Sequence, residues 1–338
     1  MRESFIAVLV LAFAACAGAA AETPQSTERE VRFRNGSVEL HGTVMLPAAK
    51  GRHPAVVFLH GSGPATRAGA RQYAEEFARL GLVSLFFDKR GSGSSGGSWL
   101  TSSLDDLARD ALAAVEHLKQ QEDIDPERVG FWGVSQAGWV ATLAASQSQD
   151  VAFMILVSGG GASPREAELF AYGQRFDRAG LSDAEKSEAL EVVDTYFHYL
   201  ATGEERPQLV ARLEAVRESR WYPLARLDQI LPSEENRANW SWVATWDPSP
   251  HIARIKCPAL LMFGDRDSDH PTMIAVQRWQ EGLAKAGNDD VTLMVFPGAG
   301  HGIRMRDGYT GTGRPPFADG YREIMLGWLW RHVIDSKE

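Results

Sequence analysis

The chain has 338 residues, of which 44% are hydrophobic and 23% are charged, and its formal net charge is -9 at pH 7. This composition is ordinary for a globular protein, and the length suits one large domain or a domain with an insertion. The acidic balance, without a long run of Lys or Arg, argues against nucleic-acid binding, which favours a basic footprint.

Residues 1–21 have the pattern of a signal peptide. Met1-Arg2 precedes an apolar run over 5–15, and Ala19-Ala20-Ala21 fits a cleavage site before Glu22. The run is too short for a membrane span. We therefore expect an exported protein, periplasmic or extracellular, whose mature chain begins near Glu22. The alternative is lipid attachment at Cys16, because Ala14-Ala15-Cys16 matches half of that pattern.

Ordinary cleavage would remove Cys16 and leave Cys257 as the one cysteine of the mature chain. A single cysteine cannot form an intrachain disulfide, so the exported protein must be stabilised by its core. Cys257 lies at the edge of an apolar stretch, and we expect it to be packed there rather than to act as a nucleophile.

The first elements predict a sheet. Residues 30–34 and 38–46 alternate apolar and polar side chains around Asn35-Gly36, which is typical of a hairpin. Continuous apolar runs over 55–59 and 82–87 predict strands buried on both faces. Helices are expected over 67–80 and 101–121, where apolar residues recur with helical spacing.

The stretch 128–142 combines an apolar strand, a tight turn of small residues and a helix. Ser135 stands at the tip of the turn, which is the context of a nucleophile elbow. Gly133 and Ala137 flank it at the positions where larger side chains would collide with the strand and helix. Ser135 is therefore the candidate nucleophile, and the alternative is a small structural serine. Ser95 is the centre of a stricter Gly-x-Ser-x-Gly pattern, but it lacks the flanking strand and helix.

Strands over 151–157, 258–263 and 291–296 alternate with helices over 271–286 and 319–333. This alternation predicts an α/β fold with a mostly parallel sheet covered by helices on both faces. Ligands of such sheets bind beyond the carboxyl ends of the strands. Ser62, Ser135, Asp267 and His301 each follow a predicted strand, so one edge of the sheet should collect them.

Residues 161–249 differ from the rest, because charged stretches with helical composition dominate there. We expect a helical lid inserted between two parts of the core, 22–160 and 250–338; the alternative is an ordinary extra helical layer. If the insertion covers the strand ends, its aromatic residues should wall the substrate pocket beside Gly61. The pocket candidates among them are Trp221, Trp240 and Trp242.

A serine hydroxyl needs a base to accept its proton, and the base needs a third group to fix its tautomer. His301, in a glycine-rich loop after the last strand, is the best-placed base, and His270 is the next candidate. The loop 264–270 offers Asp265, Asp267 and Asp269 as the third group. A calcium loop is excluded there, because the glycine and glutamate that it requires are missing.

Acyl transfer also needs donors for the oxyanion. The backbone N–H of Gln136 follows the candidate nucleophile, and a second donor is expected from the loop 60–63, where we choose Ser62.

Together these stretches resemble the α/β-hydrolase superfamily, and within it the esterase and serine-aminopeptidase-like group. The resemblance runs from about residue 30 to the end, outside the insertion. It favours Asp267 over Asp265 and implies that the loop at Asp88 and Arg90 is structural. It implies no metal or organic cofactor. The matching segments are 60–64, 88–93, 133–138, 257–267 and 298–302.

The resemblance leaves the substrate open, because one fold hosts many chemistries. The leading interpretation is an exported serine hydrolase that cleaves a carboxylic ester through an acyl-enzyme. The second is a serine aminopeptidase on short peptides, which would need a buried carboxylate such as Glu166 or Glu168 for the substrate ammonium. The third is a catalytically silent binding domain. The expected partner is a small-molecule ester or a short peptide.

Overall fold

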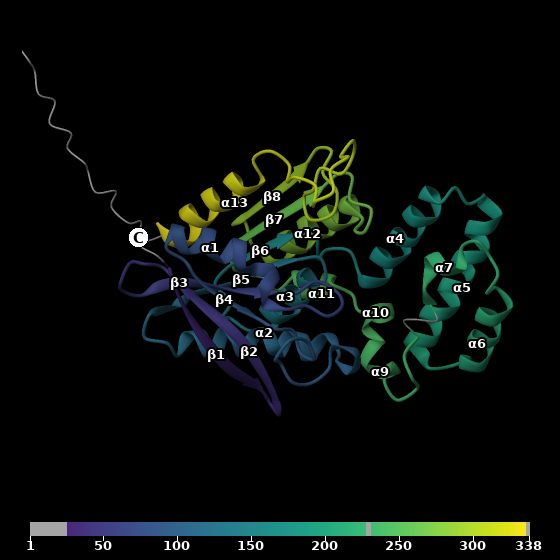
Figure 1. Cartoon of the computed structure of the whole chain (residues 1–338), viewed down its shortest axis with the longest axis horizontal. Helices are drawn as coiled ribbons and strands as arrows, with labels where there is room; N and C mark the ends of the chain where they lie inside the picture. The colour runs from purple at the N-terminus through teal and green to yellow at the C-terminus, as the bar shows by residue number, and fades with distance from the viewer. Residues whose placement is uncertain (1–25, 228–230, 336–338) are drawn as a thin grey trace, which may run out of the picture.

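The computed structural model of the chain describes residues 26–227 and 231–335 (Figure 1). The predicted signal peptide, its cleavage site and Cys16 lie outside the described residues. The chain forms an eight-stranded sheet in the order β1-β2-β4-β3-β5-β6-β7-β8. The strands are β1 (Thr27–Asn35), β2 (Val38–Leu46), β3 (His53–Leu59), β4 (Val83–Phe87), β5 (Ile124–Val134), β6 (Met154–Val157), β7 (Ala259–Gly264) and β8 (Val291–Phe296).

The sheet is antiparallel at one edge and parallel elsewhere. β1 and β2 form the predicted hairpin, in which Asn35 pairs with Val38 across the turn, and β2 pairs antiparallel with β4. From β4 to β8 every pairing is parallel. β4, β6 and β7 are buried along their whole length, as continuous apolar runs predict for strands covered on both faces.

Helices cover both faces of the sheet (Figure 1). On one face, α1 (Arg71–Leu80) and α13 (Tyr321–Leu329) enclose a core built around Phe77, Trp132 and Met325. The other face packs against three longer helices that bury Leu118, Leu143 and Leu283. These are α2 (Leu104–Lys119), α3 (Ala137–Gln147) and α12 (Thr272–Ala286). The expected α/β architecture is confirmed.

Short helical turns join these elements. They are η1 (Arg67–Ala70), which leads into α1, η2 (Trp99–Thr101), α11 (Ser249–Ile252) and the π-helical turn η3 (Trp330–Ile334).

The segment between β6 and β7 is helical and has its own hydrophobic core. α4 (Pro164–Arg178) and α5 (Asp183–Thr202) each begin at a capping box, in which a serine and a glutamate satisfy the first N–H groups. Phe176, Tyr199 and Trp221 are buried between these helices. The remaining helices are α6 (Arg206–Ala215), α7 (Tyr222–Ala225), α9 (Arg237–Trp240) and α10 (Trp242–Thr245).

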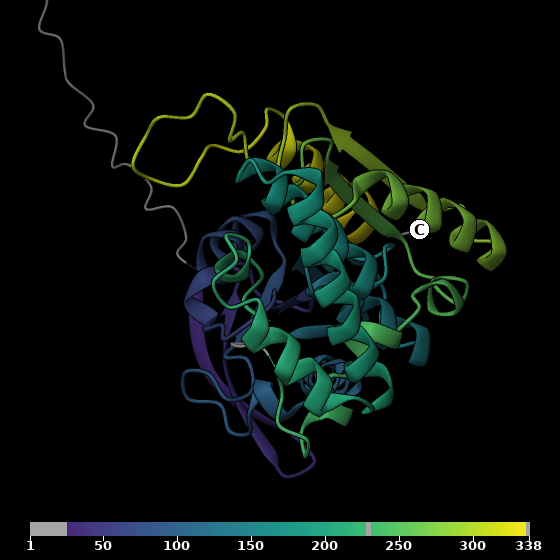
Figure 2. The same ribbon diagram turned by 90° about the vertical axis from the view of Figure 1, so that its right-hand side faces the viewer.

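Two tryptophans join this helical segment to the sheet domain. The Trp240 indole N–H donates to the carbonyl of Leu100 at 2.6 Å, and the Trp242 ring lies edge-on to Trp139 of α3. Viewed from the side of α4 and α5, the helices lie in front of the sheet domain (Figure 2).

Among the described residues, no helix is both long enough and apolar enough to cross a membrane.

Candidate active site

Ser135 occupies the sharp turn between β5 and α3. Its φ is +63°, a left-handed conformation that costs free energy for any residue with a side chain. The Ser135 N–H donates to the carbonyl of Val157 at 3.0 Å, which ties the turn to β6. A Cβ added at Gly133 would lie 2.3 Å from the Cβ of Ala137, so these two positions cannot both carry side chains. The strained backbone is therefore held by its surroundings, as at a nucleophile elbow.

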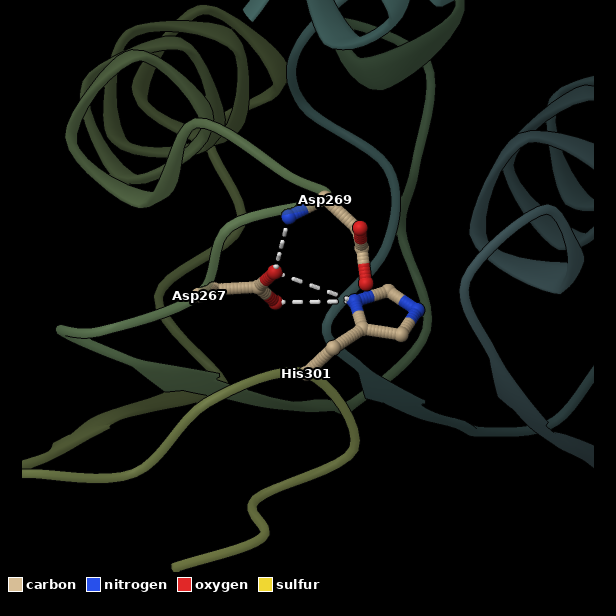
Figure 3. Close-up of side chains that lie close together, drawn as sticks. All are labelled: Asp267, Asp269 and His301. Carbon is tan, nitrogen blue, oxygen red and sulfur yellow. Dashed lines mark hydrogen bonds and ion pairs between the residues drawn. The ribbon is translucent and has the colours of Figure 1, made fainter. Parts of the chain in front are cut away.

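Asp267 and His301 form a hydrogen-bonded pair (Figure 3). The His301 Nδ1 lies 2.9 Å from Asp267 Oδ2 and 3.1 Å from Oδ1. Asp267 Oδ1 also accepts the backbone N–H groups of Asp269 and His270, at 2.9 and 3.0 Å. Because a carboxylate can only accept, Nδ1 carries the proton in this pair. The other ring nitrogen of His301, Nε2, is then free to act as a base.

The pair has shifted pKa values. Burial favours the neutral carboxyl of Asp267, but the hydrogen bond and charge of His301 outweigh it and lower the Asp267 pKa. Burial likewise opposes a charge on His301, yet the bond to Asp267 and the nearby charge of Asp269 raise the His301 pKa above 6.5. The arrangement therefore stabilises the imidazolium that proton transfer from a serine would create.

The candidate nucleophile and the candidate base meet through β6. The residue after Val157 is Ser158, and its hydroxyl accepts the N–H of Gly302 at 3.0 Å. Val157, the last residue of β6, and Ser158, which follows it, thus contact the serine turn and the histidine loop respectively. Within the described residues the Ser135 hydroxyl makes no hydrogen bond to His301. Such bonds are often long without substrate, so the geometry does not exclude the pair.

The predicted oxyanion donors lie beside the serine turn. A Cβ added at Gly61 would be 3.9 Å from the Ser135 Cβ, so the β3–α1 loop reaches the nucleophile. Gln136 is the N-cap residue of α3. In the described ranges, the N–H groups of Ser62 and Gln136 donate no hydrogen bond to the protein. Two donors are therefore available next to Ser135.

Lys89 is a residue that the sequence interpretation missed. Its Nζ donates to the carbonyls of Gly61 and Gly63, at 2.9 and 3.0 Å, and to Gln136 Oε1 at 2.7 Å. Burial lowers the Lys89 pKa to about 8, although the charge of Asp110 opposes the shift. One ammonium group thus ties both candidate oxyanion segments together. The only sequence signal was a lysine in a Gly/Ser-rich loop directly after a buried strand.

The competing candidates have other partners. His270 is buried and its Nε2 donates to the carbonyl of Gly160 at 2.8 Å, so that nitrogen is not available as a base. Asp265 accepts the N–H of Gly298 at 2.7 Å. The Ser95 hydroxyl donates to the carbonyl of Asp88 at 2.6 Å and accepts the N–H of His41. Each of these side chains stabilises a loop.

Ligand atoms of Asp267, Asp269 and His301 lie within 4.8 Å of one another, which is a spacing that could hold a metal ion. The donor set does not suit a cation. The Nδ1 proton of His301 points at Asp267, and Asp267 Oδ1 already accepts two backbone N–H groups. A metal would have to displace these bonds.

Cys257 is a free cysteine that is half-buried, and burial raises the pKa of its thiol to about 12. A thiol that stays protonated is a poor nucleophile.

A cavity of about 320 Å³ lies between the helical segment and the serine turn. It is lined on one side by Ser62, Lys89 and Gln136. Aromatic side chains from both the sheet domain and the helical segment supply much of the lining, and these are Trp99, Trp139, Tyr172, Tyr196, Phe197, Trp240 and Trp242.

The expectation for Trp221 is wrong. Its side chain is completely buried in the core of the helical segment, and its indole N–H donates to Glu188. Its neighbours Phe176 and Tyr199 provide an apolar site large enough for the ring. The predicted pocket residue Gly61 lines a different cavity, on the side of His301.

The two carboxylates proposed for an ammonium differ. Glu166 caps α4 and pairs with Arg278 at 2.8 Å, which lowers the Glu166 pKa to about 2. Glu168 lines the aromatic cavity, where burial raises its pKa. Within the described residues Glu168 makes no ion pair or hydrogen bond.

A family model described as the alpha/beta hydrolase family matches residues 56–308. Thiohydrolase aneE of Aspergillus aculeatus is 34% identical over 138 residues, which are 40% of this chain and 43% of that protein. Among solved structures, an esterase of Pyrococcus furiosus matches with a TM-score of 0.58 at 20% identity, over 91% of this chain and 92% of the other. An acylaminoacyl peptidase of Pyrococcus horikoshii matches with a TM-score of 0.58 at 18% identity, over 93% of this chain and 43% of that one.

Proposed function

Because the chain belongs to the alpha/beta hydrolase family, we propose that it is a serine hydrolase that cleaves a carboxylic ester after export from the cytoplasm. The observation that carries this proposal is the hydrogen-bonded pair of Asp267 and His301. The pair follows the carboxyl ends of β7 and β8, and the strained Ser135 follows the carboxyl end of β5 in the same sheet. The similarity to a thiohydrolase agrees with acyl transfer as the reaction type.

The proposed reaction has two halves. Ser135 Oγ attacks the ester carbonyl carbon while His301 Nε2 takes the hydroxyl proton, and Asp267 stabilises the imidazolium. The N–H groups of Ser62 and Gln136 hold the oxyanion. His301 then gives its proton to the departing alcohol, which leaves Ser135 acylated. Water attacks the acyl group by the same route and releases the acid.

The ester is favoured over the peptide by the walls of the 320 Å³ cavity. Apolar pockets with a few polar groups suit small organic ligands, and an acyl group needs no charged partner. Trp139, Trp240 and Trp242 supply such walls in the cavity that Gln136 and Ser62 also line.

The test combines labelling and substrate comparison. We expect a fluorophosphonate probe to label the purified protein at Ser135 and not to label Ser135→Ala. We also expect p-nitrophenyl esters of short to medium acids to be hydrolysed much faster than aminoacyl p-nitroanilides, after correction for their intrinsic reactivity. A folded protein that is neither labelled nor active would favour the silent binding domain.

A serine aminopeptidase is the second candidate, and Glu168 is the observation that favours it. Its carboxylate faces an aromatic cavity, and aromatic faces and a carboxylate together suit an ammonium group. Efficient turnover of alanine or proline p-nitroanilide that is lost in Glu168→Gln would replace the ester proposal. Glu166→Gln is the matched control, because Glu166 is held by Arg278.

A further inference from the structure

A second cavity, of about 430 Å³, lies beside His301, and no residue of its lining belongs to the 320 Å³ cavity. Its walls come from the β3–α1 loop, from α1 and from the loop that follows His301. The lining includes Gly61 and His301, so this space borders both the candidate oxyanion loop and the candidate base. It therefore belongs to the reaction site, yet nothing in the proposed mechanism so far uses it.

The charge of this cavity is the opposite of the charge of the protein. Four arginines line it and no Asp or Glu does, although the whole chain has a formal net charge of -9. Arg67 is neutralised by Glu30 at 2.6 Å. Arg304, Arg306 and Arg314 form no ion pair with any residue in the described ranges, including their exposed neighbour Asp307. His60 adds no charge, because burial lowers its pKa to about 4.

Among these cations, Arg304 is held in place by two contacts within the protein. Its guanidinium lies 3.4 Å from the centre of the Phe317 ring and donates to the carbonyl of Pro315 at 2.8 Å. Burial lowers the Arg304 pKa, and the guanidinium groups of Arg314 and Arg322 act in the same direction. An arginine remains charged in spite of such a shift. A half-buried guanidinium with unused N–H donors is suited to a planar anion, which it can bind through two parallel bonds.

Most of the remaining lining is apolar or aromatic, with Thr66 and the two histidines His60 and His301 as the polar members. Phe58, Phe86 and Trp132 contribute to the walls, together with Tyr73 and Phe317. A ligand that satisfies the whole cavity must therefore combine a flat apolar body with an anionic group. A fully apolar ligand would leave the arginines unpaired, and a small inorganic anion would leave the aromatic walls uncovered.

The position of His301 decides which part of a substrate enters. In the proposed reaction, His301 gives its proton to the departing alcohol, so the alcohol part must leave on the side of this histidine. We propose that the 430 Å³ cavity binds the alcohol part of the ester, and that the preferred alcohol is an aromatic one that carries a carboxylate. This assignment rests on the proposed esterase function and names its substrate class.

The proposal is tested with two esters that differ in one charge, 4-acetoxybenzoate and its methyl ester. Each kcat/KM is divided by the rate constant for hydroxide-catalysed hydrolysis of the same ester, which removes the difference in leaving-group reactivity. For the wild type we expect this ratio to favour the anionic ester by about tenfold or more, since charge-assisted hydrogen bonds are the stronger ones.

Arg304→Gln should remove most of that preference, and Arg314→Gln, at the exposed rim, should reduce it without a threat to folding. Arg304→Lys, which keeps the charge but not the planar group, should retain part of it. Arg331→Gln is the matched control. It removes one positive charge from η3, whose backbone is bonded by Arg128, a residue nearer the start of β5 than the serine turn. It should leave the preference unchanged.

A second measurement does not depend on turnover. In the Ser135→Ala protein, 4-hydroxybenzoate should raise the Tm more than methyl 4-hydroxybenzoate does, and Arg304→Gln should abolish the difference. Equal hydrolysis of both esters, or equal effects of both phenols on Tm, would overturn the anionic subsite while the esterase function stood. A charge-selective Tm effect in a protein that hydrolyses neither ester and is not labelled by a fluorophosphonate would instead keep the subsite and overturn the esterase function.

Discussion

Ser135 and Ser95 are two serines in similar sequence patterns with different surroundings. Among the described residues the Ser135 hydroxyl makes no hydrogen bond that would stabilise the fold, and Ser135 lies in the strained turn of a nucleophile elbow, whereas the Ser95 hydroxyl bonds the backbone of Asp88 and His41. Ser135→Ala should therefore lower kcat by on the order of 10³-fold or more, as loss of a member of a cooperating triad does. Ser95→Ala should keep kcat and lower the free energy of unfolding by about 1–2 kcal/mol, because it leaves buried polar groups unpaired.

Steady-state kinetics and urea denaturation of both variants measure these effects. Comparable losses of kcat in the two variants would show that Ser135 is not the nucleophile.

Asp267 and Asp265 lie two residues apart but contact different groups. Asp267→Asn should lower kcat by about 10⁴-fold, because the amide cannot hold the productive tautomer of His301. Asp265→Asn should change kcat little, since Asp265 only accepts the N–H of Gly298. Kinetics of the two purified variants decide, and the reverse ranking would transfer the orienting role to Asp265.

The same pair predicts a pH dependence. His301 must be neutral to accept the serine proton, and its folded pKa is raised above 6.5. Activity should thus be lost as the pH falls through a value above 6.5. The residual activity of Asp267→Asn should persist to lower pH before it is lost, because the main group that raises the His301 pKa is gone. Profiles of kcat/KM against pH test this shift. If activity falls at the same pH in both proteins, a group other than His301 titrates.

Lys89 connects the two candidate oxyanion segments through three hydrogen bonds. Lys89→Met would leave the carbonyls of Gly61 and Gly63 and the amide of Gln136 without this donor. We expect kcat to fall about 10- to 100-fold while KM changes little, because donors aimed at the oxyanion act mainly in the transition state. Lys89→Arg should restore part of the activity. A rise in KM at constant kcat would assign Lys89 to ground-state binding instead.

At the scale of the element, the turn between β5 and α3 is closely packed where position 133 faces position 137. Gly133→Ala would place a methyl group 2.3 Å from the Cβ of Ala137. Overpacking of this kind should lower the free energy of unfolding by about 1–3 kcal/mol and lower kcat through displacement of Ser135. Ala137→Gly in the same protein removes the closest contact and should recover part of both losses.

Denaturation of the two single variants and the double variant completes the cycle. Strictly additive effects would mean that the contact between positions 133 and 137 does not determine the turn.

At the scale of the whole molecule, export is the open prediction. If residues 1–21 are a signal peptide, the mature protein begins near Glu22 and carries Cys257 as its single cysteine. Amino-terminal sequencing and the intact mass of the exported protein measure this start. A lipid-modified mass that begins at Cys16 would show that the protein is membrane-anchored.

The sequence by itself determined the elements and their order. Continuous apolar runs such as 55–59 and 82–87 predict buried strands because a strand covered on both faces has no polar side. Small residues around Ser135 predict the turn, since the steric limit is local. These signals depend on near neighbours in the chain, and they sufficed for the fold and for a list of site candidates.

Only the tertiary structure shows which side chains meet at the site. The resemblance already favours Asp267 over Asp265 within one loop, and the hydrogen bond of Asp267 to His301, 34 positions further along the chain, supplies the physical reason. Trp221 and Trp240 occupy one insertion, yet one is buried in the helical core and the other lines a cavity. Lys89 became a candidate because its ammonium group bonds Gln136, 47 positions further along the chain. Long-range packing fixes which side chains face the site, and no local pattern contains that information.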